Sequence, residues 1–227
     1  MAPCLKYQDY SMKFYTFYTP SHKTLYDNYF LPSFPHEDME LITDELDQEC
    51  PSGTYREDGW SNTMRRKLEL IIRGIKENKD DFIVHGDCDI QFFADPSTPL
   101  SKILLSELGD NDIAFQNDGT KFCAGFFVCK CNEEILRLFT RVLSDLNLYP
   151  DDQEALNSLL PQFGVSHECL SSRFYTCAMD NNWRRYEGHE HIPVNAEELR
   201  NVVMHHANYT MGVDNKIKLL NRIRDLK

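Results

Sequence analysis

The stretch from Asp80 to Phe93 constrains the fold of this chain more than any other. An apolar run, Phe82 to Val84, leads into Gly86, after which come Asp87 and Asp89 as an Asp-x-Asp pattern and then a second apolar run. We interpret this pattern as a buried strand with two carboxylates at its carboxyl edge, where open α/β sheets bind ligands. Residues i and i+2 of an extended chain point the same way, so both carboxylates are expected to face one point.

Two carboxylates on one side of a chain repel each other unless a positive charge lies between them. Mg²⁺ and Mn²⁺ bind one or two protein carboxylates and complete their coordination with water and substrate phosphate. Alone, Asp-x-Asp is a weak signal, and its alternative is a solvated turn between two strands. An EF-hand loop is disfavoured further, because Phe92 and Thr98 stand where that loop requires Gly and Glu. The flanking apolar runs therefore favour a Mn²⁺ or Mg²⁺ site at Asp87 and Asp89.

Composition excludes some classes of protein and leaves others open. The chain has 227 residues, enough for one sizeable domain, and we expect residues 1–227 to form a single one. A net charge of −12 argues against nucleic acid as a partner. No apolar run has the length of a transmembrane segment, and the N-terminus lacks the apolar core of a signal peptide. The eight cysteines form no Cys-x-x-Cys pattern, so we expect reduced thiols, buried at Cys88, Cys123 and Cys129, in a cytoplasmic protein.

Runs rich in aromatic and β-branched residues alternate with amphipathic runs along the chain. The predicted strands are Met12–Thr19, Met39–Thr43, Phe82–Val84, the run after Asp89, Asp112–Phe115, Phe122–Lys130, Gly164–Leu170 and Val202–His205. Helices are predicted around Leu25 to Tyr29, after a cap at Ser61 or Asn62, over Pro99–Leu108 and Glu133–Leu146, after Asp151 and Asp152, and over Asn215–Leu226. The remaining segments, Cys50–Gly59 and Asp180–Glu198, are predicted to be irregular. This alternation predicts an α/β fold with a mostly parallel sheet flanked by helices.

The C-terminal part of the chain carries polar residues suited to a phosphate and metal site. His205 or His206 could complete a metal site begun by carboxylates, and Gly212 could let the backbone approach a phosphate that Lys216 neutralises. The alternative is a His pair that closes a strand and a solvated Lys. Gly125 lies inside an apolar strand, where Gly often marks the close approach of a ligand or another backbone.

Three more groups have both a structural and a functional interpretation. Asp152 and Gln153 open a helix, where acidic residues are favoured by the helix dipole alone, yet both could also point into a site. In the basic run Arg65–Lys67, two side chains are expected to be solvated while one reaches a donor phosphate or sugar. The pairs Arg184–Arg185 and His189–His191 are expected to lie in exposed loops.

In order and spacing, these motifs resemble those of a known family. The motifs are Asp87-x-Asp89, the strand with Gly125, Asp151-Asp152-Gln153-x-x-x-Asn157, and His206-x-Asn208-x-x-x-Gly212-x-x-x-Lys216. Together they resemble the nucleotide-diphospho-sugar transferases of GT-A fold, a Rossmann-like single domain. The similarity is greatest to the group that contains plant pectin xylosyltransferases and the glycosyltransferase domains of large algal viruses, and it extends from the first strand to Lys216.

The resemblance implies a role for each matching residue. It implies three metal ligands: Asp87, Asp89 and His206. It implies a nucleotide-sugar site formed by Thr19, Lys67, Asp87, Gly125, Gly212 and Lys216. Asp152 and Gln153 match the pair beside the reacting carbon of the sugar. The chain departs from the family at Cys123, where relatives often carry an Asn that contacts the donor sugar.

The function implied by the resemblance is a metal-dependent glycosyltransferase. It would move a sugar from a nucleotide sugar, a UDP-sugar first of all, to a hydroxyl of a glycan or another acceptor, with retention of configuration. Two alternatives remain open at this point: a metal-dependent nucleotide phosphoesterase or pyrophosphatase, and a nucleotide-sugar-binding module without catalysis. The sequence leaves the sugar and the acceptor undetermined.

Overall fold

The computed structural model describes residues 12–93, 97–119, 121–176 and 199–227. The strands are β1 (Met12–Tyr18), β2 (Met39–Glu45), β3 (Phe82–Gly86), β4 (Ile90–Phe92), β5 (Ile113–Asn117), β6 (Phe122–Lys130), β7 (His167–Cys169), β8 (Phe174–Thr176) and β9 (Met204–His206). The longer α-helices are α3 (Trp60–Glu77), α4 (Leu100–Leu108), α5 (Glu133–Asp145), α6 (Asp152–Leu159) and α8 (Val213–Leu226). Short 3-10 turns, η3 (Leu146–Leu148) and η4 (Leu160–Gln162), follow α5 and α6.

One helical segment after β1 changes its winding several times. It consists of a 3-10 turn η1 (Pro20–His22), α1 (Lys23–Leu25), a π-helical turn η2 (Tyr26–Phe30) and α2 (Leu31–Ser33). The segment ends at Ser33, directly after Pro32, as the sequence predicted. Its buried side chains, Leu25, Tyr26, Tyr29 and Phe30, face the interior.

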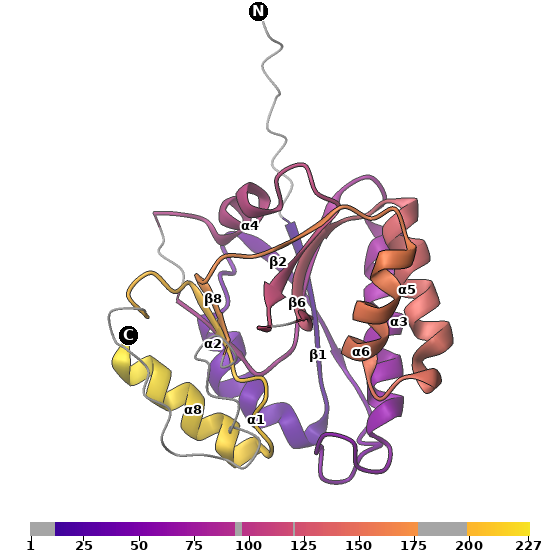
Figure 1. Cartoon of the computed structure of the whole chain (residues 1–227). Helices are drawn as coiled ribbons and strands as arrows, with labels where there is room; N and C mark the ends of the chain where they lie inside the picture. The colour runs from indigo at the N-terminus through magenta and orange to yellow at the C-terminus, as the bar shows by residue number, and fades with distance from the viewer. Residues whose placement is uncertain (1–11, 94–96, 120, 177–198) are drawn as a thin grey trace, which may run out of the picture.

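The strands form two sheets. The larger sheet has six strands in the order β2-β1-β3-β6-β5-β7, and the smaller has three in the order β4-β9-β8. In the larger sheet β1 is parallel to β2 and β3, and β5 is parallel to β7, whereas β6 runs antiparallel to both of its neighbours. Helices cover this mostly parallel sheet (Figure 1), which confirms the predicted α/β architecture.

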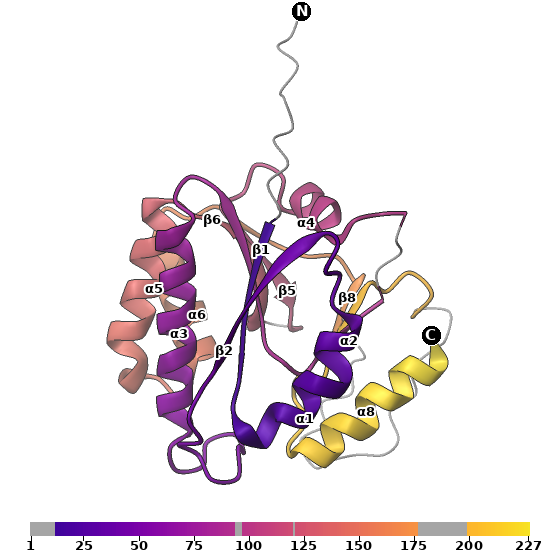
Figure 2. The same cartoon turned by 180° about the vertical axis from the view of Figure 1, so that it is seen from behind.

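An apolar core lies on each face of the larger sheet. Alternate residues of β1 supply both cores, because successive side chains of a strand point to opposite faces. Tyr15 packs on the side of α3, α5 and α6, which lie next to one another in both views (Figures 1 and 2). Phe14 packs on the other side in an aromatic cluster whose ring centroids lie 5.2 Å from Phe34 and 5.8 Å from Phe92.

Helix α8 completes the fold beside the first helical segment (Figure 2). Leu220 and Ile223 of α8 form a third apolar cluster with Leu25 and Tyr29. This packing fixes the axis of α8, and the N-terminus of the helix reaches the pocket described below through Gly212, Val213 and Lys216. Among the described residues, no helix combines the length and the apolar composition needed to cross a bilayer.

Some predicted element positions differ from the structure. The N-cap of α3 is Gly59 rather than Ser61 or Asn62, and the helix begins at Trp60, because Gly59 adopts a φ of 81°. Strand β7 covers only His167–Cys169 of the predicted Gly164–Leu170, and β9 lies further along the chain than predicted, so it contains His206. Strand β8 was not predicted. The whole segment Asp180–Glu198 that was expected to be irregular, with Arg184, Arg185, His189 and His191, lies outside the described residues.

Candidate active site

The Asp-x-Asp pattern lies where the chain leaves one sheet and enters the other. Strand β3 of the larger sheet ends at Gly86, and β4 of the smaller sheet begins at Ile90. Asp87 and Asp89 therefore occupy a bend rather than an extended strand, which corrects the predicted reason for their proximity. The backbone N–H of Asp87 donates to the carbonyl of Gly125 at 2.8 Å, which fixes the bend against β6.

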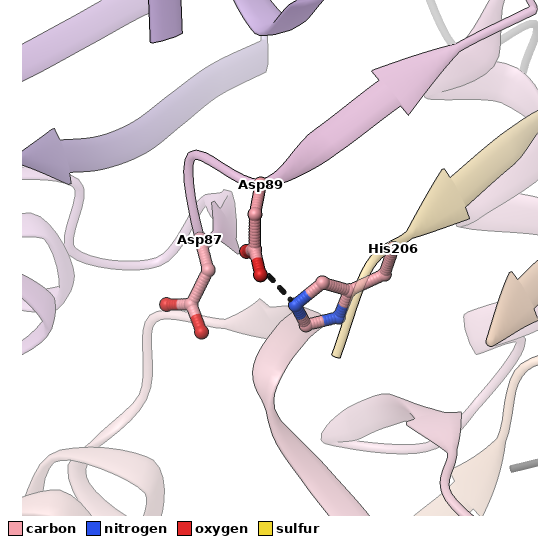
Figure 3. Close-up of side chains that lie close together, drawn as sticks. All are labelled: Asp87, Asp89 and His206. Carbon is pink, nitrogen blue, oxygen red and sulfur yellow. Dashed lines mark ion pairs between the residues drawn. The ribbon is translucent and has the colours of Figure 1, made fainter. Parts of the chain in front are cut away.

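Strand pairing brings His206 to these carboxylates from far along the chain. Strands β4 and β9 are antiparallel with Ile90 opposite His206, and the N–H of Ala207 donates to the carbonyl of Asp89 at 2.9 Å. Nε2 of His206 lies 3.2 Å from Oδ1 of Asp89, as Figure 3 shows. Ligand atoms of Asp87, Asp89 and His206 all lie within 4.8 Å of one another, so the structure brings together the three residues predicted as metal ligands.

Gly125 is the residue that leaves room for this cluster. A Cβ atom at position 125 would lie 2.5 Å from Oδ2 of Asp87 and 2.6 Å from Cε1 of His206. Both distances are far shorter than contacts between atoms that are not bonded to each other. The close approach predicted for this Gly is therefore an approach of β6 to two of the three candidate ligands.

Two lysines neutralise the aspartates of the Asp-x-Asp pattern. Lys67 is 3 % exposed, and its Nζ lies 3.0 Å from Oδ1 of Asp87 and 3.1 Å from Oδ2 of Asp152. Lys216 forms an ion pair with Asp89 and donates to the carbonyl of Ala207 at 2.9 Å. The site thus holds alternating charges, and each carboxylate of the Asp-x-Asp pattern has its own ammonium group.

The burial of these groups and their partners set their ionisation. Burial opposes charge on Asp89, but Lys216 and His206 outweigh it and hold its pKa well below the usual range. The pKa of Asp87 is likewise lowered, because Lys67 and His85 outweigh the effect of burial. Burial alone would lower the pKa of Lys67, yet Asp152 and Asp87 raise it above its ordinary value. These aspartates and Lys67 are therefore charged at neutral pH.

One side chain of the basic run Arg65–Lys67, which lies in α3, enters the site. Arg65 and Arg66 lie on the outside of α3, where they contact Asn147 and Glu69. Lys67 points inward from the same helix. Arg66 is exposed, Arg65 is partly exposed and Lys67 is buried, so Lys67 is the residue of this run that lines the pocket.

Asp151, Asp152 and Gln153 divide the capping and site functions among themselves. Oδ1 of Asp151 accepts from the N–H of Glu154 at 2.7 Å and caps α6, so the structural interpretation holds for this residue. Asp152 reaches Lys67, as described above. The amide of Gln153 is held at both ends, because Oε1 accepts from Ala124 N–H at 3.2 Å and Nε2 donates to Asp118 at 2.7 Å.

All these groups line one pocket with a volume of about 360 Å³. The predicted site residues on its walls are Thr19, Lys67, Asp87, Asp89, Gly125, Asp152, Gln153, His206, Gly212 and Lys216. Thr19 stands at the end of β1, 4 % exposed, with its hydroxyl 3.1 Å from that of Ser21. Cys123, at the position where the family often has Asn, is also buried in this wall, with Sγ 3.9 Å from Nδ1 of His206.

Asp118 is a pocket residue that the sequence analysis missed. It follows β5, is 1 % exposed, and accepts hydrogen bonds from Tyr209, Gln153 and Asn208. Burial outweighs these three donors and raises its pKa. Its signal in the sequence was the same as that of Asp87, a carboxylate just after an apolar strand, but no second carboxylate drew attention to it.

The pocket rim carries aromatic residues that were also missed. Tyr55 and Trp60 contact each other edge to face, with ring centroids 5.0 Å apart, and both line the pocket. The hydroxyl of Tyr55 donates to Oδ2 of Asp151 at 2.6 Å, which ties the rim to the start of α6. Tyr55 belongs to the predicted loop Cys50–Gly59, whose polar composition gave no reason to expect a ligand contact.

Several solved structures share this fold. A glycosyltransferase involved in the glycosylation of the major capsid of PBCV-1 superposes with a TM-score of 0.63 and 10% identity, covering 93% of this chain and 99% of that one. GlyE of Streptococcus pneumoniae TIGR4 gives a TM-score of 0.54 at 14% identity, over 95% of this chain and 63% of its own. The bifunctional glycosyltransferase WbbM gives 0.56 at 11% identity, over 97% of this chain and 52% of its own.

The sequence comparisons assign the family. No curated protein sequence matches the chain. The family model of the nucleotide-diphospho-sugar transferases matches residues 35–220, which is most of the chain and includes every pocket residue discussed above except Thr19. Together with the shared fold, this match shows that the chain belongs to the nucleotide-diphospho-sugar transferases and is a GT-A glycosyltransferase that uses a nucleotide-sugar donor.

Proposed function

We propose that this chain transfers a sugar from a UDP-sugar to a hydroxyl of a glycan acceptor, with retention of configuration and with dependence on Mn²⁺ or Mg²⁺. The observation that carries the proposal is the cluster of Asp87, Asp89 and His206 in the wall of the pocket. The uridine nucleotide and the retention follow from the sequence resemblance. We further propose that residues 1–227 act as one catalytic domain, and the cytoplasmic location stays a prediction.

The donor atoms at the cluster fit a hard divalent cation. Carboxylate oxygens suit Mg²⁺ and Mn²⁺, and an imidazole nitrogen is compatible with Mn²⁺. Two carboxylates and one imidazole leave coordination positions for phosphate oxygens and water, as in other phosphate-binding sites. When bound, such a cation supplies Lewis-acid stabilisation of the departing diphosphate. Asp87, Asp89 and His206 would hold it.

The N-terminus of α8 would bind the diphosphate together with Lys216. The helix has 14 residues, begins after Gly212, and carries Lys216 in its first turn. Exposed N–H groups and the helix dipole favour an anion at such an end, and an ammonium group adds a full charge. Lys216 would exchange its ion pair with Asp89 for contacts with phosphate oxygens. Thr19, at the end of β1, would line the nucleoside end of the pocket.

Asp152 and Gln153 would act on the sugar. Lys67 holds the Asp152 carboxylate in place through an ion pair, so a fixed carboxylate stands in the pocket. Such a charge stabilises the positive charge that develops on the anomeric carbon as the diphosphate departs. The amide of Gln153, fixed by Ala124 and Asp118, would orient the same sugar.

The acceptor would enter over the aromatic rim. Tyr55 is 37% exposed and Trp60 is partly exposed, and their rings line the same pocket as Asp152. Sugars pack their apolar C–H faces against aromatic rings, and the Tyr55 hydroxyl bond to Asp151 keeps this rim rigid. We therefore propose that the acceptor is itself a sugar residue that rests on Tyr55 and Trp60.

A panel of nucleotides and nucleotide sugars in a thermal-shift assay, with Mn²⁺ and with EDTA, tests the donor and the metal. A ligand that binds only the native state raises the melting temperature by mass action. We expect UDP and one UDP-sugar to stabilise the protein with Mn²⁺ and to lose that effect with EDTA. Equal stabilisation in EDTA would overturn the metal dependence, and stabilisation by another nucleotide alone would overturn the choice of UDP.

Product analysis then tests the transfer. With the stabilising donor and a mixture of glycan acceptors, we expect a new glycosidic linkage with the anomeric configuration of the donor, read by NMR. Free sugar and nucleotide as the only products would contradict the transfer.

A further inference from the structure

Gln116 lies directly behind the candidate metal cluster and does not line the pocket. It belongs to β5 and is fully buried, with an exposed fraction of 0%. Its Oε1 lies 2.8 Å from Nδ1 of His206, on the side of the imidazole ring that faces away from Asp89. No motif of the sequence singled out this residue, and no role assigned above uses it.

The orientation of the Gln116 amide follows from a second contact. Its Nε2 donates to the backbone carbonyl of Phe174 at 3.2 Å. A carbonyl oxygen can only accept, so a rotated amide would place two acceptors against each other in a buried position, which is costly. Oε1 therefore faces His206 and can only accept from it.

This orientation determines which nitrogen of His206 carries hydrogen. A fixed acceptor at 2.8 Å requires a proton on Nδ1, and in the neutral imidazole the other nitrogen then has a free lone pair. That nitrogen, Nε2, is the one that lies 3.2 Å from Asp89 in the cluster. The other group near Nδ1, the thiol sulfur of Cys123, lies 3.9 Å away and is a much weaker partner.

We propose that Gln116 is a positioning residue that holds His206 in the tautomer and ring orientation needed to bind a divalent cation through Nε2. The inference rests on the proposed metal site, but it concerns a residue outside the pocket. A hydrogen bond from the second nitrogen of a metal-binding His commonly fixes its tautomer in this way, and its loss typically weakens metal binding by about 10–100-fold.

The position of Gln116 also explains how the cluster is assembled from two sheets. β5 belongs to the larger sheet, whereas Phe174 and His206 belong to β8 and β9 of the smaller one. From β5, the Gln116 amide thus contacts β8, an outer strand of the smaller sheet, and β9, its central strand. It keeps His206 in register with the aspartates that follow β3.

Nitrogen NMR of the metal-free protein tests the tautomer without depending on catalysis. We expect the ¹⁵N shifts of His206 to show a proton on Nδ1 in the unmodified protein, whether or not Nε2 also carries one beside Asp89. Gln116→Met keeps the length of the side chain but removes the amide, so we expect the proton to move to Nε2, beside Asp89. An Nδ1 without hydrogen in the unmodified protein would overturn the proposal, whether or not the variant folds.

Mn²⁺ titration followed by electron paramagnetic resonance tests the consequence for the metal. We expect Gln116→Met to weaken Mn²⁺ binding by about 10–100-fold, and Gln116→Glu, which keeps an acceptor for Nδ1–H, to restore most of it. Gln91→Met is the matched control, because Gln91 is also buried, at 6%, and lies on β4, which pairs with the strand of His206. We expect this control to bind Mn²⁺ as the unmodified protein does.

The two measurements separate failure of this inference from failure of the proposed function. If Gln116→Met binds Mn²⁺ as tightly as the control, Gln116 does not position the ligand and the inference is wrong. If the unmodified protein binds no Mn²⁺, the metal proposal fails and this inference is overturned with it. A Gln116→Met protein that binds Mn²⁺ normally while UDP-sugar turnover also persists would leave the proposed function standing and overturn the inference alone.

Discussion

An aspartate lies next to each end of strand β5, and the pKa values of the two side chains are shifted in opposite directions. Asp112 precedes the strand and accepts from Ser166 N–H at 2.9 Å, from the Ser166 hydroxyl at 2.7 Å and from Asn132 at 2.8 Å. Asp118 follows the strand and also has three donors. Yet the pKa of Asp112 is lowered, because the hydrogen bonds outweigh its partial burial, whereas burial raises the pKa of Asp118.

Three hydrogen-bond donors to a carboxylate therefore serve a different purpose at each end of β5: they stabilise the fold at Asp112, and they fix pocket residues at Asp118. At the Asp112 end, a partly exposed carboxylate joins β5 to the segments before β7 and α5, which stabilises the fold. At the Asp118 end, a fully buried carboxylate remains electrostatically costly and holds Gln153 and Tyr209 in the pocket wall. Residues that destabilise the folded state are commonly found at functional sites, where they hold binding or catalytic groups in place. The following predictions test whether the two ends divide stability and activity in this way.

The largest effect is expected from Asp89→Ala at the pocket end. The substitution removes a candidate ligand and the ion-pair partner of Lys216, so we expect Mn²⁺-dependent turnover to disappear while the fold is kept. Turnover of the UDP-sugar and circular dichroism measure the two properties. Full activity in this variant would show that the metal does not bind at Asp89.

Gly125→Ala is expected to have the next largest effect. A Cβ atom there would collide with Asp87 and His206, and a displacement of about 1 Å at reacting groups can cost on the order of 100-fold in rate. Gly164→Ala is the control, because no heavy atom lies within 4 Å of its added Cβ. Metal affinity and turnover should fall only in the first variant, and an equal loss in both would point to a general effect on folding.

Asp118→Asn and Asp112→Asn should have opposite consequences at neutral pH. We expect Asp118→Asn to lower turnover about tenfold, because the amide of Gln153 loses its charged partner, with no loss of stability. We expect Asp112→Asn to keep its activity but to lose about 1 kcal/mol of stability with its charge-assisted hydrogen bonds, a value reduced for solvent screening. Urea unfolding measures the stability of both variants, and initial-rate kinetics measure their turnover. If either substitution lowered both stability and turnover, the proposed division between the two ends of β5 would be wrong.

Removal of the aromatic rim is expected to have a smaller effect on acceptor binding. Trp60→Ala should raise the acceptor KM about fivefold and leave the donor KM unchanged, since one aromatic contact contributes about 1 kcal/mol. Initial-rate kinetics with each substrate varied separately measure the two constants. An increase in the donor KM instead would place the nucleotide, rather than the acceptor, against Trp60.

The smallest expected effect is a difference in pH dependence between the two ends. The lowered pKa of Asp112 means that its contribution to stability is complete above the ordinary value of 3.8 and is lost as the pH falls through the folded-state pKa. The raised pKa of Asp118 has the opposite sign, so the protein gains stability as the pH falls through that pKa toward 3.8. Unfolding free energies between pH 7 and pH 3, each relative to the matching Asn variant, should therefore change in opposite directions.

The sequence predicted the elements whose patterns are local. Strand β6 has the predicted bounds, Phe122–Lys130, because an unbroken apolar run buried on both faces leaves little choice of structure. The start of α6 was also predicted, since Asp151 caps it by a bond within the same turn. The N-cap at Gly59 was missed, because its positive φ is set by a loop that packs against Glu49 rather than by the helix itself.

The candidate site was predictable only where a motif marked it. The Asp-x-Asp pattern and the spacing from His206 to Lys216 identified residues that the structure brings together. Gln116 and Asp118 remained hidden, because their importance comes from the pairing of β5 with strands remote in sequence. The predicted mechanism by which Asp87 and Asp89 converge was wrong, since a crossing between sheets cannot be read from alternation alone.

The ion pair between Lys216 and Asp89 has a consequence for how a divalent cation and a nucleotide diphosphate would bind. A cation at Asp89 and a diphosphate at Lys216 each require this pair to separate. Once either ligand has separated it, the other binds without that penalty, so the two are positively coupled, and linkage makes the coupling equal in both directions. The chain would then bind the cation and the nucleotide diphosphate together, and it would bind either of them alone more weakly.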